Sequence, residues 1–141
     1  MSSFRWLLGV VVVFVFTSVA SAETITARVS LATQTMYVYI GDTLMHTWPV
    51  STARPGYKTP PGSYEPYLLN KNHRSRIYDN APMPYAIFFL RGYAVHGTTA
   101  RKALGRRASH GCVRLLTENA QMLFMLVQQY GKQSTRIIIE P

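Results

Sequence analysis

The sequence predicts one small, mostly β domain of the sandwich or barrel kind, with one main helix near its end. Three observations favour this class. A chain of 141 residues is long enough for one modest domain and too short for two. Hydrophobic residues make up 48% of the chain and charged residues 15%, which excludes a disordered tail and a coiled coil. Short runs rich in Thr, Val, Ile and Tyr recur, and turn residues separate them.

Residues 1–22 are expected to be a signal peptide and not part of this domain. Arg5 supplies a positive charge, residues 6–16 are almost uninterruptedly apolar, and Ala20-Ser21-Ala22 has the small residues of a cleavage site. The alternative is an uncleaved anchor, but the apolar stretch is shorter than the roughly 20 residues that span a bilayer. We therefore expect an exported protein of the periplasm or cell envelope, with its domain over residues 23–141.

The first half of this domain is predicted to consist mainly of strands. Three runs have strand composition: residues 25–31, 36–40 and 44–50. The turn residues Gly41-Asp42-Thr43 indicate that the second and third runs form a hairpin. Regular structure is not expected in the Pro- and Gly-rich stretch 55–62. Residues 64–84 are polar and aromatic, and we expect a long excursion over the surface, a kind of segment that often serves as a functional lid.

The second half is predicted to contain strands at 85–90, 93–95 and 136–139, and one helix. The helix is expected to be capped by Thr117, to carry Glu118 in its first turn and to end at Gly131. Residues at helical spacing are expected to form its core-facing side, widened by three more: Ala120, Leu123, Phe124 and Val127, then Met122, Met125 and Leu126.

The charge balance points to an anionic partner. The chain has 15 Lys and Arg residues against 6 Asp and Glu residues, a formal net charge of +9. Export makes nucleic acid a poor candidate for that partner. The single cysteine, Cys112, excludes an intramolecular disulfide. In an oxidising compartment an unpaired thiol is a liability unless it is used, so Cys112 is a buried inert residue, an intermolecular disulfide or a nucleophile.

The residues around Cys112 favour a reactive thiol. Cys112 lies ahead of the predicted helix, whose N-terminal partial charge, together with Arg114 and a nearby imidazole, would stabilise a thiolate. Gly111 permits close backbone approach, so the amides of Gly111 and Cys112 could form an oxyanion hole. His96, at the end of a predicted strand, is the natural general base.

Two other interpretations stay open at this point. His96 and His110 could be ordinary histidines satisfied by backbone hydrogen bonds. They could also bind zinc together with Cys112, although neither His46 nor His73 has the spacing of a fourth ligand.

Two motifs resemble the signature of the L,D-transpeptidases of the YkuD domain family: His96-Gly97-Thr98 and Ser109-His110-Gly111-Cys112-Val113-Arg114-Leu115. The segments 49–52, 59–62 and 83–85 resemble upstream blocks of the same domain, so the resemblance covers nearly all of residues 25–140. It implies a small, mostly β catalytic domain with one or two helices.

The resemblance also implies roles for single residues. Cys112 would be the nucleophile, His96 the base and the Gly97 carbonyl the group that orients the imidazole. His110, Gly111 and Cys112 would frame the oxyanion site. Three further side chains would contact the peptide substrate: Ser109, Arg114 and Tyr85. Arg114 stands where some members of the family have Asn.

The implied reaction is acyl transfer on peptidoglycan stem peptides. The thiolate would attack the diamino acid at position three, release D-alanine and form a thioester. Transfer to a stem-peptide amine would give a 3→3 cross-link, and transfer to an envelope protein would anchor that protein to the wall. Alternatives are an L,D-carboxypeptidase or amide hydrolase at the same site and a non-catalytic wall-binding module. We expect a monomer that needs no metal or organic cofactor.

Overall fold

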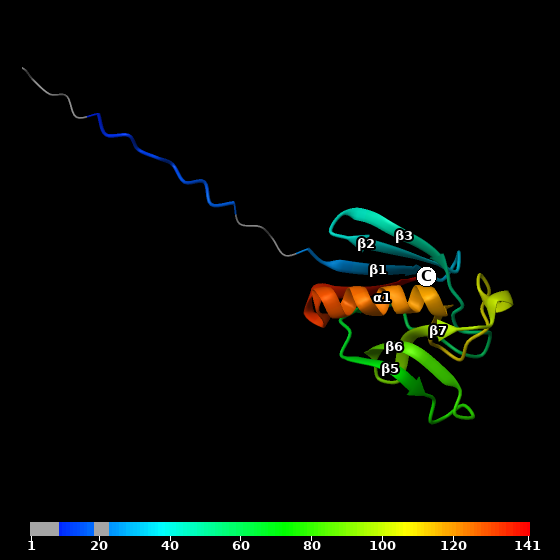
Figure 1. Ribbon diagram of the computed structural model, residues 1–141. Helices are drawn as coiled ribbons and strands as arrows, with labels where there is room; N and C mark the ends of the chain where they lie inside the picture. Colours follow the sequence, from blue (N-terminus) through cyan, green and yellow to red (C-terminus); the bar gives the residue numbers. More distant parts are fainter. Residues whose placement is uncertain (1–8, 19–22) are drawn as a thin grey trace, which may run out of the picture.

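The computed structural model describes residues 9–18 and 23–141, and residues 25–140 form two β-sheets and one long helix (Figure 1). The first sheet has the strand order β3-β2-β1-β9-β4: β1 (Ile25–Ser30), β2 (Thr35–Ile40), β3 (Thr43–Pro49), β4 (Gly62–Tyr64) and β9 (Thr135–Glu140). The second has the order β5-β6-β7-β8: β5 (Leu68–Arg74), β6 (Pro82–Leu90), β7 (Tyr93–Thr98) and β8 (Val113–Leu116). The helix α1 spans Thr117–Tyr130, and two 3-10 turns, η1 and η2, span Arg101–Ala103 and Lys132–Ser134. The predicted mostly β class with one main helix is confirmed.

Alternating side chains along the central strands of the first sheet face the core. In β1, Ile25, Ala27 and Val29 are fully buried, while the residues between them are partly exposed. β1 pairs in parallel with β9 on one side and antiparallel with β2 on the other. The predicted hairpin of β2 and β3 is present, and Gly41 turns it with a φ of 57°, a conformation that glycine adopts without strain.

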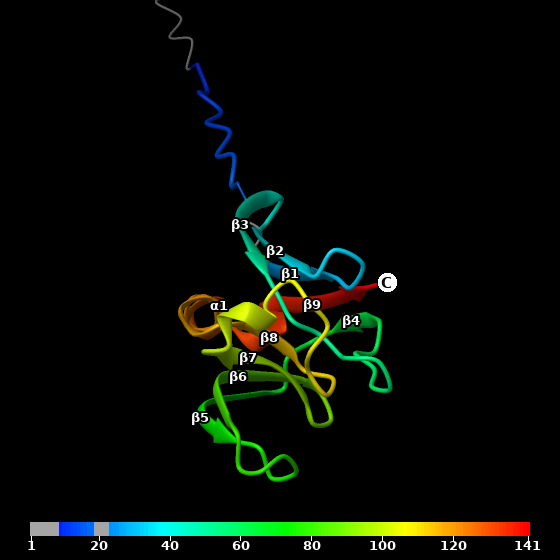
Figure 2. The ribbon, with the colours of Figure 1, turned by 90° about the vertical axis from the view of Figure 1, so that its right-hand side faces the viewer.

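The helix lies between the two sheets along one side of the domain, as Figures 1 and 2 both show. Its four predicted core residues are buried and join the main cluster: Ala120, Leu123, Phe124 and Val127. Leu126 packs against this cluster as expected. Met122 and Met125 do not, because at 100° per residue they point away from the buried stripe, and they are 44% and 57% exposed.

The start of the helix differs from the prediction. Leu116 is the N-cap residue and Thr117 is already the first helical residue, so Thr117 does not cap the helix. The physical reason is that β8 runs straight into α1 with no loop, which leaves no room for a capping turn. Glu118 lies in the first turn as predicted, and Gly131 ends the helix with a φ of 94° while its N–H donates to the Val127 carbonyl.

The surface excursion expected over residues 64–84 contains regular structure that the sequence analysis did not predict. It contains β5, whose residues are mainly exposed because the strand lies at the edge of its sheet and pairs only with β6. Polar residues are typical of such edge strands, which explains why the segment did not look like a strand. Its irregular parts are residues 65–67 and the connection between β5 and β6, residues 75–81, which lies beside the candidate site described below. Residues 55–61 lack regular structure, as predicted.

The predicted signal peptide falls largely outside the described residues, including Arg5 and the small residues at 20–22. Residues 10–16 of its apolar stretch are exposed and adopt neither helix nor strand. In the described part of the chain, no helix has the length and apolar composition needed to cross a membrane.

Candidate active site

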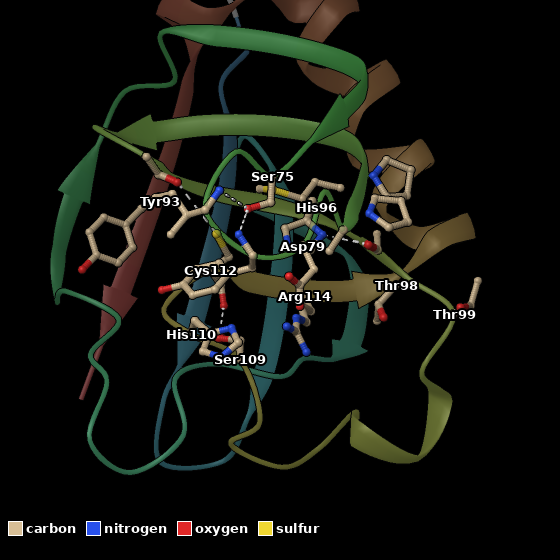
Figure 3. A pocket seen from close by; sticks show the side chains of 18 of the residues that line it. Ser75, Asp79, Tyr93, His96, Thr98, Thr99, Ser109, His110, Cys112 and Arg114 are labelled. Carbon is tan, nitrogen blue, oxygen red and sulfur yellow. Dashed lines mark hydrogen bonds between the residues drawn. The ribbon is translucent and has the colours of Figure 1, made fainter.

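A cavity of about 770 Å³ lies against the second sheet. Its walls come from the β5–β6 connection and the start of β6, from β7 and the residue before it, from the loop that leads into β8, and from Arg114 and Thr117 (Figure 3). Cys112 and His96 both line it, so the structure brings the two central residues of the sequence prediction into one pocket.

The parallel pairing of β7 with β8 explains this proximity. In the register of the two strands, His96 lies beside Arg114, and Val95 lies beside Val113. Cys112 is the residue directly before β8, two positions from Arg114, and side chains two positions apart along a strand point to the same face. Residues 99–112 form the long crossover that a parallel pair requires. His96, Arg114 and Cys112 therefore share one face of the sheet.

The His96 imidazole is buried and held in one tautomer. The side chain is 6% exposed, and its Nδ1 lies 2.8 Å from the Gly97 carbonyl oxygen. Since a carbonyl can only accept, Nδ1 carries the proton and Nε2 is the unprotonated nitrogen. The pKa of His96 is lowered to about 4, mainly by burial; the Gly97 hydrogen bond opposes this shift, and the electrostatic effects of Arg114 and His73 add to it. At neutral pH His96 is thus a neutral base.

The Cys112 thiol is protonated at rest. Burial raises the pKa of Cys112, while the Ala94 N–H and the Arg114 cation oppose the shift. The expected help from a helix N-terminus is absent, because the four residues of β8 separate Cys112 from the first turn of α1. The field of a helix dipole is felt mainly within that turn. A protonated thiol in the same pocket as a neutral imidazole means that the base must take the proton when the thiol attacks.

The loop before Cys112 is shaped by Ser109 and Gly111. The buried Ser109 Oγ accepts the Gly111 N–H at 3.0 Å and donates to the Cys112 carbonyl at 2.7 Å. This corrects the expected oxyanion hole: the Gly111 N–H is already engaged, which leaves the Cys112 N–H as the amide of that pair that can face an oxyanion. Gly111 has a φ of 139°, and a Cβ there would lie 2.6 Å from the Tyr93 ring, so only glycine fits.

The Gly97 position is also closed to larger residues. A Cβ there would lie 2.9 Å from the Thr117 Cα and 3.1 Å from Pro84 Cγ. The bare backbone of Gly97 therefore lets the start of α1 approach β7, and the same residue supplies the carbonyl that orients His96.

Three buried polar residues that the sequence reasoning did not select support the loop before Cys112: Gln34, Thr52 and Thr59. Thr59 Oγ1 donates to the Gly111 carbonyl at 2.7 Å and accepts the Ala53 N–H at 3.1 Å. The Gln34 amide exchanges two hydrogen bonds with Thr52, at 2.7 and 2.9 Å. The only signal in the sequence was the place of Thr52 and Thr59 in the upstream blocks, and no local pattern marks Gln34.

Of the other residues predicted to contact the oxyanion or the substrate, some line the pocket and one does not. Arg114 and His110 line the pocket, and the His110 ring stacks on Tyr78 at 4.0 Å between centroids and 11° between planes. Ser109 also lines it, but both hydrogen bonds of its hydroxyl stay within the loop. Tyr85 does not line the pocket, because its ring packs edge-on against Phe124 at 5.6 Å. Tyr78, on the β5–β6 connection, is a pocket residue that the sequence reasoning missed.

The structure gives no support to the zinc interpretation. Within residues 9–18 and 23–141, no group of three or more His, Cys, Asp or Glu side chains is arranged to hold a metal ion.

The known proteins that this chain is similar to are L,D-transpeptidases. The model of the YkuD family, described as the L,D-transpeptidase catalytic domain, matches residues 25–139. A curated protein of Escherichia coli K12 named "Probable L,D-transpeptidase YbiS" is 50% identical over 46 residues, which are 33% of this chain and 15% of that protein.

Two solved structures are similar over most of the domain. A crystal structure of an L,D-transpeptidase from Mycobacterium tuberculosis H37Rv superposes with a TM-score of 0.74 and 25% identity, covering 84% of this chain and 58% of that one. A second L,D-transpeptidase structure, from Stackebrandtia nassauensis, has a TM-score of 0.72 and 25% identity, covering 86% and 57%. The chain thus spans less than two thirds of the length of each of these proteins.

Proposed function

The chain belongs to the YkuD family of L,D-transpeptidase catalytic domains, and from this membership we propose that it is a cysteine-dependent L,D-transpeptidase of peptidoglycan stem peptides. The observation that carries the proposal is the 2.8 Å contact of His96 Nδ1 with the Gly97 carbonyl, in the same pocket as the Cys112 thiol. An oriented neutral imidazole sharing a pocket with a protonated thiol is the arrangement that a thiol nucleophile requires.

The first half-reaction is acylation of the thiol. Cys112 Sγ attacks the carbonyl carbon of the diamino acid at position three, and its proton passes to His96 Nε2. The oxyanion of the tetrahedral intermediate faces the Cys112 N–H. The bond to the terminal D-alanine then breaks, the imidazolium returns the proton to the leaving amine, and a thioester remains on Cys112.

The second half-reaction transfers the acyl group to an amine. The amine gives a proton to His96 Nε2 and attacks the thioester carbonyl, so that a C–N bond forms and the C–S bond breaks. The released thiolate recovers the proton from His96. A stem-peptide amine as acceptor gives a 3→3 cross-link, an amine of an envelope protein anchors that protein, and water gives an L,D-carboxypeptidase or amide hydrolase.

We place this reaction outside the cytoplasm, in the periplasm or cell envelope. The support is the composition of residues 1–22, a charged start followed by an apolar run and small residues. Peptidoglycan is an extracytoplasmic polymer with carboxylates on its stem peptides, which fits the excess of 15 basic over 6 acidic residues.

One experiment tests the proposal. The protein and its Cys112→Ala variant are incubated with disaccharide tetrapeptide, and products are followed by mass spectrometry. Cross-linked dimer supports transpeptidation, and loss of D-alanine without dimer supports hydrolysis. Turnover that survives in Cys112→Ala excludes the thiol mechanism, and no turnover with the wild-type protein favours the non-catalytic module. A carbapenem adduct that disappears with Cys112→Ala is a simpler first measurement.

A further inference from the structure

The β5–β6 connection brings one carboxylate to the active-site pocket. Among the described residues that line this pocket, Asp79 is the only acidic one (Figure 3). Its carboxylate takes part in none of the ion pairs or hydrogen bonds found in residues 9–18 and 23–141. By contrast, three of the five other acidic side chains are paired with arginine: Glu65, Glu118 and Glu140. An unpaired acid in the pocket of a strongly basic protein therefore needs a reason.

The turn that carries Asp79 is well defined by its own hydrogen bonds. Asp79 and Asn80 have φ angles of 48° and 51°, and the Ala81 N–H donates to the Tyr78 carbonyl at 2.9 Å. Two successive left-handed residues inside such a bond form a type I′ turn, which Asp and Asn tolerate. Ser75 Oγ accepts the Tyr78 N–H at 3.0 Å, and the Arg74 guanidinium donates to the Asn80 carbonyl at 3.0 Å.

The same turn packs against the loop that precedes Cys112. Tyr78 stacks on His110, two residues before Cys112, with 4.0 Å between the ring centroids. The His110 ring also meets the edge of Tyr57 at 4.9 Å, so it is held from two sides. Asp79 follows Tyr78 directly, and the stack therefore holds the turn that carries Asp79 beside the loop that bears the thiol.

The pocket thus has charges of opposite sign at two depths. Arg114 projects from the sheet beside His96 and is partly buried, whereas Asp79 is exposed on the connection above it. The partly buried Arg114 cation is suited to bind a carboxylate of the donor peptide, which enters first. The exposed Asp79 carboxylate is suited to bind a cationic group of the acceptor, which arrives later from solvent. The formal net charge of +9 repels an approaching ammonium group. A carboxylate in the pocket would offset this repulsion locally and attract the ammonium group.

We propose that Asp79 binds the ammonium group of the incoming acceptor and so favours transfer of the acyl group to an amine over its transfer to water. This inference rests on the proposed transpeptidase function and names the residue that selects the acceptor. Asp79 is not the base. The bound ammonium first releases one proton to solvent, and the neutral amine then gives a second proton to His96 Nε2 as it attacks the thioester, as in the second half-reaction above. Water carries no charge and gains nothing from Asp79.

The test separates the two half-reactions in the full-length protein. The thioester is formed with a tetrapeptide donor and then exposed to an amine-bearing stem peptide, and mass spectrometry gives the ratio of dimer to hydrolysed product. Asp79→Asn keeps the turn because Asn also adopts left-handed conformations. Asp42→Asn is the matched control, since it removes the same charge from an exposed turn at the far end of β2.

The expected result is a drop in the dimer-to-hydrolysis ratio of about three- to tenfold for Asp79→Asn, the range for losing one partly solvated ion pair. The rate of acylation and the reaction with hydroxylamine, an uncharged nucleophile at neutral pH, keep their wild-type values. Asp42→Asn leaves the ratio unchanged.

Three outcomes overturn the inference. An unchanged ratio in Asp79→Asn shows that Asp79 does not select the acceptor. A rate of acylation that falls as much as the rate of transfer shows that Asp79 contacts the donor. A wild-type protein that forms no thioester at all removes the proposed function itself, which distinguishes that failure from the first two.

Discussion

The buried, neutral state of His96 has a measurable consequence for stability at low pH. The perturbation is acidification from pH 8 to pH 5, compared between the wild-type protein and His96→Gln. The pKa of His96 is lowered by burial from 6.5 to about 4, so as pH falls the unfolded chain binds a proton before the folded one does. The contribution of His96 to stability is therefore full above pH 6.5 and is lost as pH falls toward 4.

The size of this loss follows from the two pKa values. Each pH unit between 6.5 and 4 removes about 1.4 kcal/mol of the free energy of unfolding, because one proton separates the two states. At pH 5 the loss is about 2 kcal/mol, and below pH 4 it levels at about 3 kcal/mol. These values are large beside a total stability of roughly 5–15 kcal/mol.

Urea unfolding followed by circular dichroism at several pH values measures this loss directly. Glutamine does not titrate, and its amide can donate to the Gly97 carbonyl, so His96→Gln lacks the His96 contribution to the pH dependence. The other three histidines are present in both proteins and cancel in the comparison. Equal losses of stability in the two proteins, or an NMR titration that puts the His96 pKa near 6.5, would refute the reasoning.

Two further predictions concern the loop that positions Cys112. Gly111→Ala is expected to lower the free energy of unfolding by about 2–4 kcal/mol and to abolish thioester formation, because the new Cβ meets the Tyr93 ring at a strained φ. Gly105→Ala is its control in urea unfolding, since Gly105 also has a positive φ but open space around it, and an equal loss there would exclude the steric reason. Thr59→Val is expected to cost about 1–3 kcal/mol by leaving the Gly111 carbonyl without its donor, and to slow acylation by a carbapenem followed by mass spectrometry. Thr59→Ser keeps the hydroxyl and should restore the acylation rate; if it does not, the hydrogen bond is not the cause.

Features carried by local sequence patterns were predictable. The core side of α1 followed from residues three and four positions apart, and the β2–β3 hairpin followed from a turn signal between two runs of strand composition. Cys112 and His96 stood out because each lies in one of the two motifs that resemble the family signature, and the structure places them in one pocket.

Features that depend on distant pairing were not predictable. Thr59 and Gly111 are 52 residues apart in sequence, and nothing near either residue signals their hydrogen bond. Asp79 and Tyr78 reach the pocket only because β5 is a strand, and its polar edge position concealed that. The sequence indicated that the Gly111 N–H could face an oxyanion. In the folded loop this N–H donates to Ser109 Oγ instead, and no local pattern signals that hydrogen bond.

The position of β9 has a consequence for how the chain folds. β9 lies between β1 and β4, pairing with the first strand of the domain on one side and with β4 on the other. Until residues 135–140 have left the ribosome, β1 and β4 lack their common partner and the first sheet stays open. Sheets that join distant parts of a chain form late and slowly. We therefore expect the first sheet to close only after residues 135–140 have been made.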